Sequence, residues 1–213
     1  MAHQKYIAIG DIHGCYQSLE ALLKKLEPFA DRQFIFIGDY IDRGPDSKKV
    51  VERLMEFQQQ ADCVFLRGNH EQMLLDAFND GEFKLWISNG GKATLKSYGI
   101  DRFGRLPDAH FDFYDQTKFY YETNEYFFVH AGLSAAKTIK ESLQDEEEIE
   151  AFLWERSHLN AFETPWEKKV VFGHTPRPQP IRKNGMIGID TGCVFKRMGY
   201  GKLTAVKLPE EEF

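Results

Sequence analysis

The sequence predicts an α/β fold in which two packed, mixed β-sheets are flanked by helices. The first 80 residues alternate short apolar runs with segments of helical periodicity, which is the order of parallel strands joined by right-handed crossovers. Further short apolar runs return after residue 118, and they favour a second sheet over a single open one. Because the 213 residues contain no linker or internal repeat, we expect a single domain over residues 1–213.

Strands and helices in the N-terminal part are indicated by simple patterns. Each expected strand is a short apolar run, and the first two runs end at a glycine. Leucines recur at helical spacing before Pro28, which ends the first helix. Asp46 or Ser47 is suited to cap the second helix. The strands are expected at 6–9, 34–37 and 63–66, and the helices at 17–26, 46–57 and 71–78.

The rest of the chain has weaker patterns. Residues 80–118 are expected to be helices and loops, and 118–123 with 126–130 to form a hairpin. The segment 141–150 contains six acidic residues. It is expected to form an exposed helix or lid, with a solvated face as the simplest interpretation and its role left open. Late strands are expected at 169–172, 186–189 and 203–208.

Composition excludes several classes of protein. A net charge of −6 argues against a broad nucleic-acid-binding surface. No window approaches 18 apolar residues and no secretory signal opens the chain, so we expect no membrane partner and a cytoplasmic location. Three cysteines without a CxxC spacing fit reduced thiols that serve packing. The chain ends soon after its last expected strand, so no regulatory subunit or domain is evident.

Six short polar motifs place glycines beside oxygen or imidazole groups. In open α/β sheets, ligands bind at the carboxyl ends of the strands, where the first three motifs are expected. Any one motif could be an accident, but six in one chain indicate a site for two metal ions and a phosphate. The motifs are GDIHG at 10–14, GDYIDRG at 38–44, RGNHE at 67–71, HAG at 130–132, GHT at 173–175 and DTG at 190–192.

The candidate metal ligands lie within these motifs. A lone histidine or aspartate of this kind would more often be a core or capping residue, but the convergence of six reverses that expectation. Asp39 has two carboxylate oxygens and can bridge two cations. The mixture of carboxylate, amide and imidazole groups suits Mn or Fe, with Zn as an alternative, and we favour manganese. The six candidates are Asp11, His13, Asp39, Asn69, His130 and His174.

The motif set resembles the phosphoprotein phosphatase family of calcineurin-like metallophosphoesterases, in its compact bacterial and phage-type form. The resemblance extends from residue 10 to residue 192, and both the order and the spacing of the motifs agree. It implies two divalent ions that lower the pKa of a bridging water, so that a hydroxide attacks phosphorus in line with the leaving oxygen. One ion would be held by Asp11, His13 and Asp39, and the other by Asp39, Asn69, His130 and His174.

The same resemblance implies roles for the other charged motif residues. His70 is similar to the family's general acid, and Asp42 would hydrogen-bond it and favour its protonated form. The forked guanidinium groups of Arg43 and Arg67 suit bidentate contacts with phosphate. Arg156 is a looser match to a third phosphate-binding arginine, with a surface salt bridge as the alternative.

Glu71 and the motif at 190–192 are expected to support the site, whereas two further histidines are assigned no role. Glu71 is expected to cap or orient its own loop rather than to contact substrate. The motif at 190–192 is expected to close a loop that supports the metal ligands. His110 and His158 lie outside every motif and are assigned no role.

Three functions fit the motifs to different degrees. The preferred one is a protein serine/threonine phosphatase, with phosphotyrosine and small phosphoesters as further substrates. The alternative is a hydrolase of dinucleoside polyphosphates such as diadenosine tetraphosphate; symmetrical enzymes of that branch tend to lack the equivalents of Asp42, Arg67 and Glu71. All three are present here, although other polyphosphate hydrolases retain the Asp-Arg-Gly. An inactive scaffold is disfavoured because every expected ligand is present.

Overall fold

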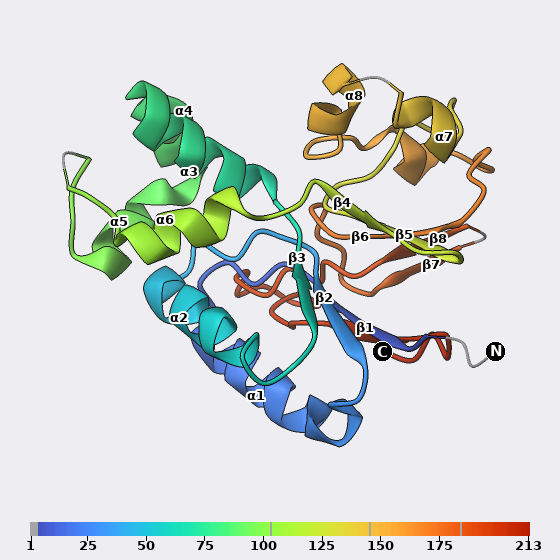
Figure 1. Cartoon of the computed structure of the whole chain (residues 1–213), viewed down its shortest axis with the longest axis horizontal. Helices are drawn as coiled ribbons and strands as arrows, with labels where there is room; N and C mark the ends of the chain where they lie inside the picture. Colours follow the sequence, from blue (N-terminus) through green and yellow to red (C-terminus); the bar gives the residue numbers. More distant parts are fainter. Residues whose placement is uncertain (1–3, 103, 145, 184) are drawn as a thin grey trace.

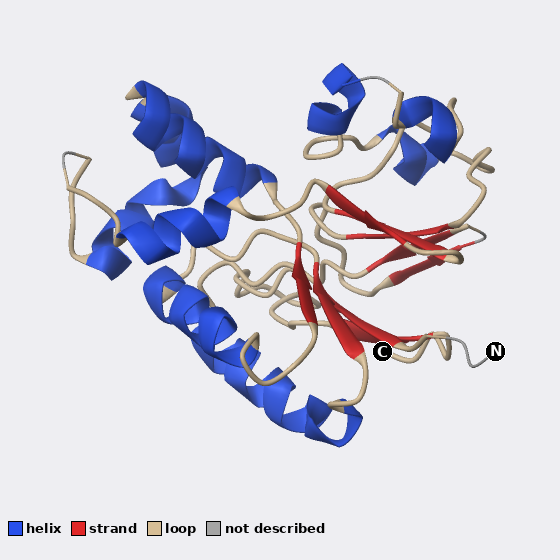
Figure 2. Cartoon of the chain, viewed as in Figure 1, coloured by secondary structure: helices blue, strands red, loops and turns tan. Residues whose placement is uncertain are grey.

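The structure is a computed structural model that describes residues 4–102, 104–144, 146–183 and 185–213. Two mixed β-sheets lie face to face, and helices cover their outer sides, as predicted (Figures 1 and 2). None of the helices in the described part of the chain has the length and apolar content that crossing a bilayer requires.

The first sheet is built from the N-terminal half of the chain and one late strand. Its order is β3-β2-β1-β9, with β1, β2 and β3 parallel and β9 antiparallel to β1. Its strands are β1 (Tyr6–Ile9), β2 (Gln33–Phe36), β3 (Cys63–Phe65) and β9 (Ala205–Leu208). The connecting helices α1 (Tyr16–Leu26) and α2 (Ser47–Phe57) lie on its outer side (Figure 1). These bounds agree with the predicted ones to within a residue or two.

The second sheet has the order β4-β5-β6-β8-β7. Three central strands, β5 (Tyr126–Val129), β6 (Lys169–Phe172) and β8 (Met186–Gly188), are parallel, and an antiparallel strand lies at each edge. One edge is β4 (Tyr120–Glu122), which forms the predicted hairpin with β5. The other edge, β7 (Ile181–Lys183), was not predicted, because three largely polar residues carry no strand signal.

Apolar residues on both faces of the strands explain why the strands read as continuous apolar runs. In β1, Ile7 and Ile9 face the cluster under α1 and α2, whereas Tyr6 and Ala8 face the second sheet. Residues such as Phe128 on the second sheet complete the core between the sheets. A third cluster lies on the outer face of the second sheet.

A helical lobe continues directly from β3. It comprises α3 (Asn69–Asp80), α4 (Phe83–Trp86), the π-helical turn η2 (Ile87–Gly91), α5 (Lys92–Tyr98) and α6 (Asp108–Asp115). Gly90 has φ 116° inside η2, so the backbone bends there. The fully buried Trp86 anchors this lobe to the rest of the fold.

Short helices cover the outer face of the second sheet. They are α7 (Ile139–Ser142), α8 (Glu146–Ala151) and η3 (Ser157–Asn160). A separate 3-10 turn, η1 (Glu27–Phe29), belongs to the other end of the chain and follows α1. Ile139 and Phe152 pack against the sheet. The acidic segment therefore forms parts of two short helices, although Asp145 lies outside the described residues.

Candidate metal centre and active site

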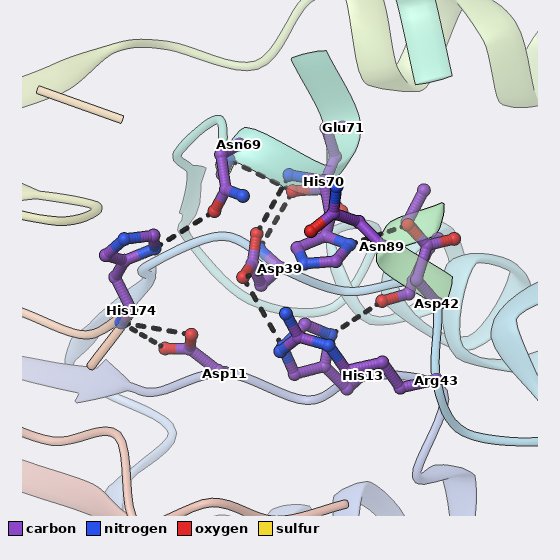
Figure 3. Close-up of polar contacts among 12 residues, drawn as sticks. Asp11, His13, Asp39, Asp42, Arg43, Asn69, His70, Glu71, Asn89 and His174 are labelled. Carbon is purple, nitrogen blue, oxygen red and sulfur yellow. Dashed lines mark hydrogen bonds and ion pairs between the residues drawn. The ribbon is translucent and has the colours of Figure 1, made fainter. Parts of the chain in front are cut away.

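Each of the six polar motifs follows one of the six parallel strands, three in each sheet. Carboxyl ends of parallel strands meet at one edge, and here the edges of both sheets face each other. The side chains of Asp11, Asp39, Asn69 and His174 consequently point toward a common centre (Figure 3). This arrangement brings together residues from both halves of the chain.

Four ligand atoms converge between α3 and the second sheet. His130 Nε2 lies 3.0 Å from Asn69 Oδ1 and 3.2 Å from His174 Nδ1, and the latter two atoms are 3.0 Å apart. The carboxylate of Asp39 completes the group, with Oδ1 3.4 Å from His130 Nε2. All four side chains are buried.

The hydrogen bonding of these imidazoles fits a cation. His130 Nδ1 donates to the carbonyl oxygen of Ile37 at 3.0 Å, so that Nε2 presents a lone pair to the amide oxygen of Asn69. Burial lowers the pKa of His130, and it lowers that of His174 to about 2, which keeps both rings neutral. Neutral imidazoles and acceptor oxygens that face one another are the donor set of a transition-metal site.

A second group of ligand atoms shares Asp39 with the first. It consists of His13, Asp39 and His70, and these are the two groups found among the described residues. His13 Nε2 lies 3.4 Å from Asp39 Oδ2, while His13 Nδ1 donates to the carbonyl oxygen of Ile41 at 2.8 Å. Burial lowers the pKa of His13 to about 3, so its Nε2 keeps a lone pair. This lone pair accepts a hydrogen bond from Arg43 Nη1, which would have to open for His13 to bind an ion. Asp39 is thus placed to bridge two ions.

Asp11 lies beside these groups without belonging to either. Its carboxylate accepts hydrogen bonds of 3.1 and 3.0 Å from the backbone N–H of His174. Burial, with the charges of Asp190 and Asp39, raises its pKa well above the ordinary value. A Cβ at Gly173 would lie 2.1 Å from Asp11 Oδ1, so this motif needs glycine. The predicted role of Asp11 as a metal ligand remains a prediction.

Glu71 orients the loop that carries Asp39. Its carboxylate accepts hydrogen bonds from the backbone N–H groups of Asp39, Tyr40 and Gly68, at 2.8, 2.9 and 3.0 Å. The backbone N–H of His70 in turn donates to Asp39 Oδ1 at 3.1 Å. The bonds from Glu71 hold the shared carboxylate in place, in agreement with the orienting role expected from the sequence.

The motif at 190–192 closes its loop against the chain before β9. The Thr191 hydroxyl donates to the carbonyl oxygen of Lys202 at 2.7 Å, and the Gly192 N–H donates to Asp190 Oδ1 at 2.8 Å. Asp190 is buried and lies close enough to Asp11 for their charges to interact. This geometry supports the loop-closing role that the sequence indicated.

His70 and Asp42 form a buried pair at the edge of the ligand groups. His70 Nδ1 lies 2.6 Å from Asp42 Oδ2, and both residues are completely buried. Burial opposes the imidazolium, but the charge of Asp39 and the hydrogen bond to Asp42 outweigh it and raise the pKa of His70. His70 Nε2 has no hydrogen-bond partner among the described residues and lies 3.9 Å from Asp39 Oδ2. The pair can therefore hold a proton at Nε2, next to the predicted metal ligands.

Two residues that the sequence did not reveal hold Asp42. The indole Nε1–H of Trp86 donates to both carboxylate oxygens, at 3.1 and 2.9 Å, and the hydroxyl of Thr94 donates to Oδ1 at 2.6 Å. Burial raises the pKa of Asp42, and the bonds from His70, Thr94 and Trp86 oppose that rise. No sequence signal could have found this contact, since Trp86 is 44 positions from Asp42.

Replacing Trp86 by phenylalanine is expected to lower kcat about tenfold, because a hydrogen bond to a charged group contributes roughly 1.5–3 kcal/mol. The alkaline limb of the pH–rate profile should move to lower pH, since a less well held Asp42 supports the His70 imidazolium less. Metal content should not change. Trp166→Phe is the matched control, because its indole donates to the Ser134 carbonyl oxygen outside the site. Equal effects of both substitutions on kcat would rule out a specific role for Trp86.

Arg43 lies beside His13, and Arg156 lies beside Thr175, the neighbour of His174 in the chain. Arg43 Nη1 donates to His13 Nε2 at 2.7 Å. Arg156 is exposed and its Nε donates to the hydroxyl of Thr175 at 3.2 Å, beside His174. Trp154 packs edge-on against the His174 ring on the same side, with centroids 5.9 Å apart. Both arginines are therefore placed where they can contact a phosphate at the ligand groups.

Arg67 has other partners in the structure. Its Nε donates to the Thr117 hydroxyl at 3.1 Å, Nη1 to Gln72 Oε1 at 2.9 Å and Nη2 to the Asp115 carbonyl oxygen at 2.6 Å. Its guanidinium carbon also lies 5.0 Å from the centre of the Phe119 ring. These contacts join the end of β3 to the end of α6. The predicted phosphate contact of Arg67 stays a prediction and would require some of these bonds to open.

His158, which has no predicted role, is a buried histidine without a hydrogen bond to the described residues, and we expect it to make the fold sensitive to acid. It is completely buried against Gly132 and Phe172, and neither ring nitrogen forms a hydrogen bond within the part of the chain that the structure describes. Burial lowers its pKa to about 4 from an ordinary value of 6.5, against the opposing charge of Glu155. The unfolded chain therefore binds more protons than the folded chain between these pH values. The contribution of His158 to the free energy of unfolding is complete above pH 6.5 and is lost as the pH falls toward 4.

The free energy of unfolding should fall by about 3 kcal/mol through His158 as the pH falls from 6.5 to 4. Chemical denaturation of the wild type and of His158→Phe over this range, both in EDTA, measures the effect. Other titrating groups are common to both proteins, so the difference between the two curves isolates His158. Parallel curves would show that His158 does not titrate in this way.

The chain is similar to known phosphoesterases over most of its length. The family model described as calcineurin-like phosphoesterase matches residues 5–195. Bis(5′-nucleosyl)-tetraphosphatase PrpE (asymmetrical) of Oceanobacillus iheyensis is 29% identical over 232 residues, covering 96% of this chain and 89% of that protein. The protein of the same name from a Geobacillus species is 30% identical, and the aligned region covers 96% of this chain and 90% of that protein.

Solved structures share the fold at lower identity. A crystal structure provisionally described as a diadenosine tetraphosphatase has a TM-score of 0.69 at 24% identity, covering 98% of this chain and 91% of its own. The cold-active protein-tyrosine phosphatase of a Shewanella species has a TM-score of 0.68 at 20% identity, with coverages of 97% and 76%. A protein serine/threonine phosphatase of Saccharomyces cerevisiae has a TM-score of 0.63 at 18% identity, with coverages of 92% and 70%. At these identities the similarity concerns the fold.

Proposed function

The chain belongs to the calcineurin-like phosphoesterase family, and on that premise we propose that it hydrolyses dinucleoside tetraphosphates asymmetrically. The products would be a nucleoside triphosphate and a nucleoside monophosphate. One observation carries the proposal, namely the similarity to two proteins named as asymmetrical tetraphosphatases over nearly the full length of each chain. This observation favours the alternative reading of the sequence over a protein phosphatase.

The residues that favoured a protein phosphatase distinguish this chain only from symmetrical dinucleoside polyphosphate hydrolases. Asp42, Arg67 and Glu71 distinguish the chain from that branch, but the relatives are named as asymmetrical enzymes, which the criterion does not address. In the structure, Glu71 orients Asp39 and Arg67 binds the end of α6, and both functions are independent of the substrate. The three residues therefore carry no weight against a dinucleotide substrate.

The two ligand groups fit a pair of divalent ions, for which we propose manganese. Such ions, when bound, supply an activated water and stabilise charge on the phosphate oxygens. His13 and Asp39 would hold one ion, with Asp11 beside them. The other ion would be held by Asp39, Asn69, His130 and His174.

The remaining residues act on the phosphate and the leaving group. His70, held by Asp42, keeps a proton at Nε2 and gives it to the leaving oxygen. Arg43 and Arg156 bind phosphate oxygens, with which a guanidinium can form two parallel hydrogen bonds. These roles are supported by the contacts of Arg43 with His13, of Arg156 with Thr175 and of His70 with Asp39.

Product analysis tests this proposal. Purified protein with Mn²⁺ should convert diadenosine tetraphosphate into equal amounts of ATP and AMP, and it should do so with a higher kcat/KM than for a phosphoserine or phosphotyrosine peptide. A parallel sample in EDTA should be inactive. Formation of ADP alone would show symmetrical cleavage. Faster hydrolysis of the phosphopeptides than of diadenosine tetraphosphate would favour the protein phosphatase hypothesis instead.

A further inference from the structure

A groove of about 960 Å³ extends from Arg43 away from the metal ligands. Its walls are the loops before α1 and α2, one side of α5, and the loop of residues 193–201. Arg43 belongs to both places, because it lines the groove and donates to His13 Nε2. A substrate whose reacting phosphate lies at the ligand groups can therefore extend into this groove.

The groove is basic although the chain as a whole is acidic. The net charge of the chain is −6, yet four cationic residues line the groove against one acidic residue, Asp46. Asp46 Oδ1 in turn lies 3.2 Å from Lys49 Nζ. Helix α1 begins here without an acidic residue in its first turn, so its positive end adds to the attraction for anions, whereas α2 begins directly after Asp46. The four cationic residues are Arg43, Lys96, Lys196 and Arg197.

An aromatic pair lies in the same groove. The rings of Phe195 and Tyr200 meet edge to face with centroids 6.3 Å apart. The guanidinium carbon of Arg197 lies 5.0 Å from the centre of the first ring and 4.9 Å from that of the second, while Arg43 lies 5.9 Å from Phe195. Aromatic rings interleaved with arginines bind planar bases that carry phosphates, through stacking and charge.

We propose that this groove binds the nucleoside triphosphate half of a dinucleoside tetraphosphate. The base lies against Phe195 and Tyr200, and the phosphates lie along the four cations. This inference rests on the proposed function and adds a reason for its asymmetry. Because the groove selects the longer and more highly charged half, the phosphate of the other nucleoside is left at the metal ligands.

The reaction balances with water as the co-reactant. Water adds to the phosphorus of the monophosphate half, and the bond from that phosphorus to the oxygen of the triphosphate half breaks. The triphosphate leaves with that oxygen, which takes the proton held at His70 Nε2. The monophosphate keeps the oxygen and one proton of water, and the other proton of water is released and restores the protonated His70. Specificity for a triphosphate thus comes from a surface that lies mostly outside the six motifs, with Arg43 as its one cation within them.

Nucleotide binding without turnover tests the groove. The full chain in EDTA is titrated into fluorescent mant-ATP or mant-AMP, and anisotropy gives each Kd. We expect mant-ATP to bind at least about tenfold more tightly than mant-AMP, since its longer phosphate chain meets more cations. Phe195→Ala and Arg197→Gln should each weaken binding of mant-ATP by roughly fivefold or more.

Matched controls separate the groove from general surface effects. Phe162→Ala replaces a phenylalanine that is 96% exposed, and Arg105→Gln replaces an exposed arginine; neither residue lines the groove. Both variants should bind mant-ATP as the wild type does. Arg197 is itself exposed, so Arg197→Gln should keep its fold, and a thermal melt of each variant verifies this.

The outcomes distinguish the groove from the proposed activity. If the wild type makes ATP and AMP from diadenosine tetraphosphate but both groove variants bind mant-ATP normally, the groove assignment is wrong and the activity stands. Displacement of mant-ATP by a phosphoserine peptide at lower concentration than by ATP would also overturn the assignment. If mant-ATP binds as expected and diadenosine tetraphosphate is not cleaved, the activity fails while the groove remains a nucleotide site.

Discussion

Replacing His70 by asparagine is expected to lower kcat by roughly two to four orders of magnitude on an alkyl phosphate such as phosphoserine. The variant loses the proton that Nε2 would give to the leaving oxygen, and it loses the hydrogen bond to Asp42. The effect should be smaller on diadenosine tetraphosphate, because the leaving oxygen there belongs to a phosphate chain and is a weaker base. Steady-state kinetics on both substrates measure this contrast.

Metal content decides between two roles for His70. The imidazole lies in one of the two ligand groups, so loss of an ion from His70→Asn would identify it as a ligand rather than a proton donor. We expect two ions per chain to remain, as measured by plasma mass spectrometry. His110→Asn is the matched control, since His110 is also buried but bonds to the Tyr98 hydroxyl. Asp42→Asn should resemble His70→Asn, and the double variant should be little worse than either.

Replacing Asp39 by asparagine is expected to be the most damaging single change. The substitution keeps the shape of the side chain but removes the charge that His13 and His130 approach to 3.4 Å on either side. Because Asp39 is shared by both ligand groups, the variant should retain at most one ion per chain and lose at least about three orders of magnitude in kcat/KM. Isothermal titration with Mn²⁺ and hydrolysis of an aryl phosphate measure the two losses.

Asp31→Asn is the control for that experiment, because Asp31 is exposed and lies outside both ligand groups. It should bind two ions and retain full activity. Retention of two tightly bound ions by Asp39→Asn would show that the carboxylate does not bridge them. The ligand groups would then have to be assigned separately.

Much of the fold could be predicted because its strands are buried on both faces. Runs such as residues 6–9 and 170–172 are apolar without alternation, and their ends at glycine-containing motifs locate the edge of each sheet. The polar edge strand β7 has neither feature and was missed. The helical lobe could be predicted only in outline, because its short helices are set by packing around Trp86.

The part of the candidate site that is formed by motif residues could be predicted from the sequence. His13, Asp39, Asn69, His130 and His174 meet as expected, since parallel strands deliver their ends to one place. The contacts of Trp86 and Thr94 with Asp42 span 44 and 52 positions and leave no pattern in the sequence. The partners of Arg67 were hidden for the same reason, because most of its bonds go to residues 114–117.

The substrate could not be chosen from the motifs, because they describe the reacting phosphate and not what is attached to it. The groove from Arg43 to Tyr200 is formed by exposed and half-buried side chains of four separate segments. Each segment alone reads as an ordinary solvated loop or helix surface. Only their assembly in the fold shows a basic, aromatic surface beside the metal ligands.

Anomalous diffraction from crystals grown with Mn²⁺ tests the central claim most directly. The account predicts two peaks per chain, roughly 3.5–4 Å apart, with Asp39 between them. One peak should lie next to His13 Nε2, and the other next to Asn69 Oδ1, His130 Nε2 and His174 Nδ1. A single peak, or two peaks that do not share Asp39, would contradict it.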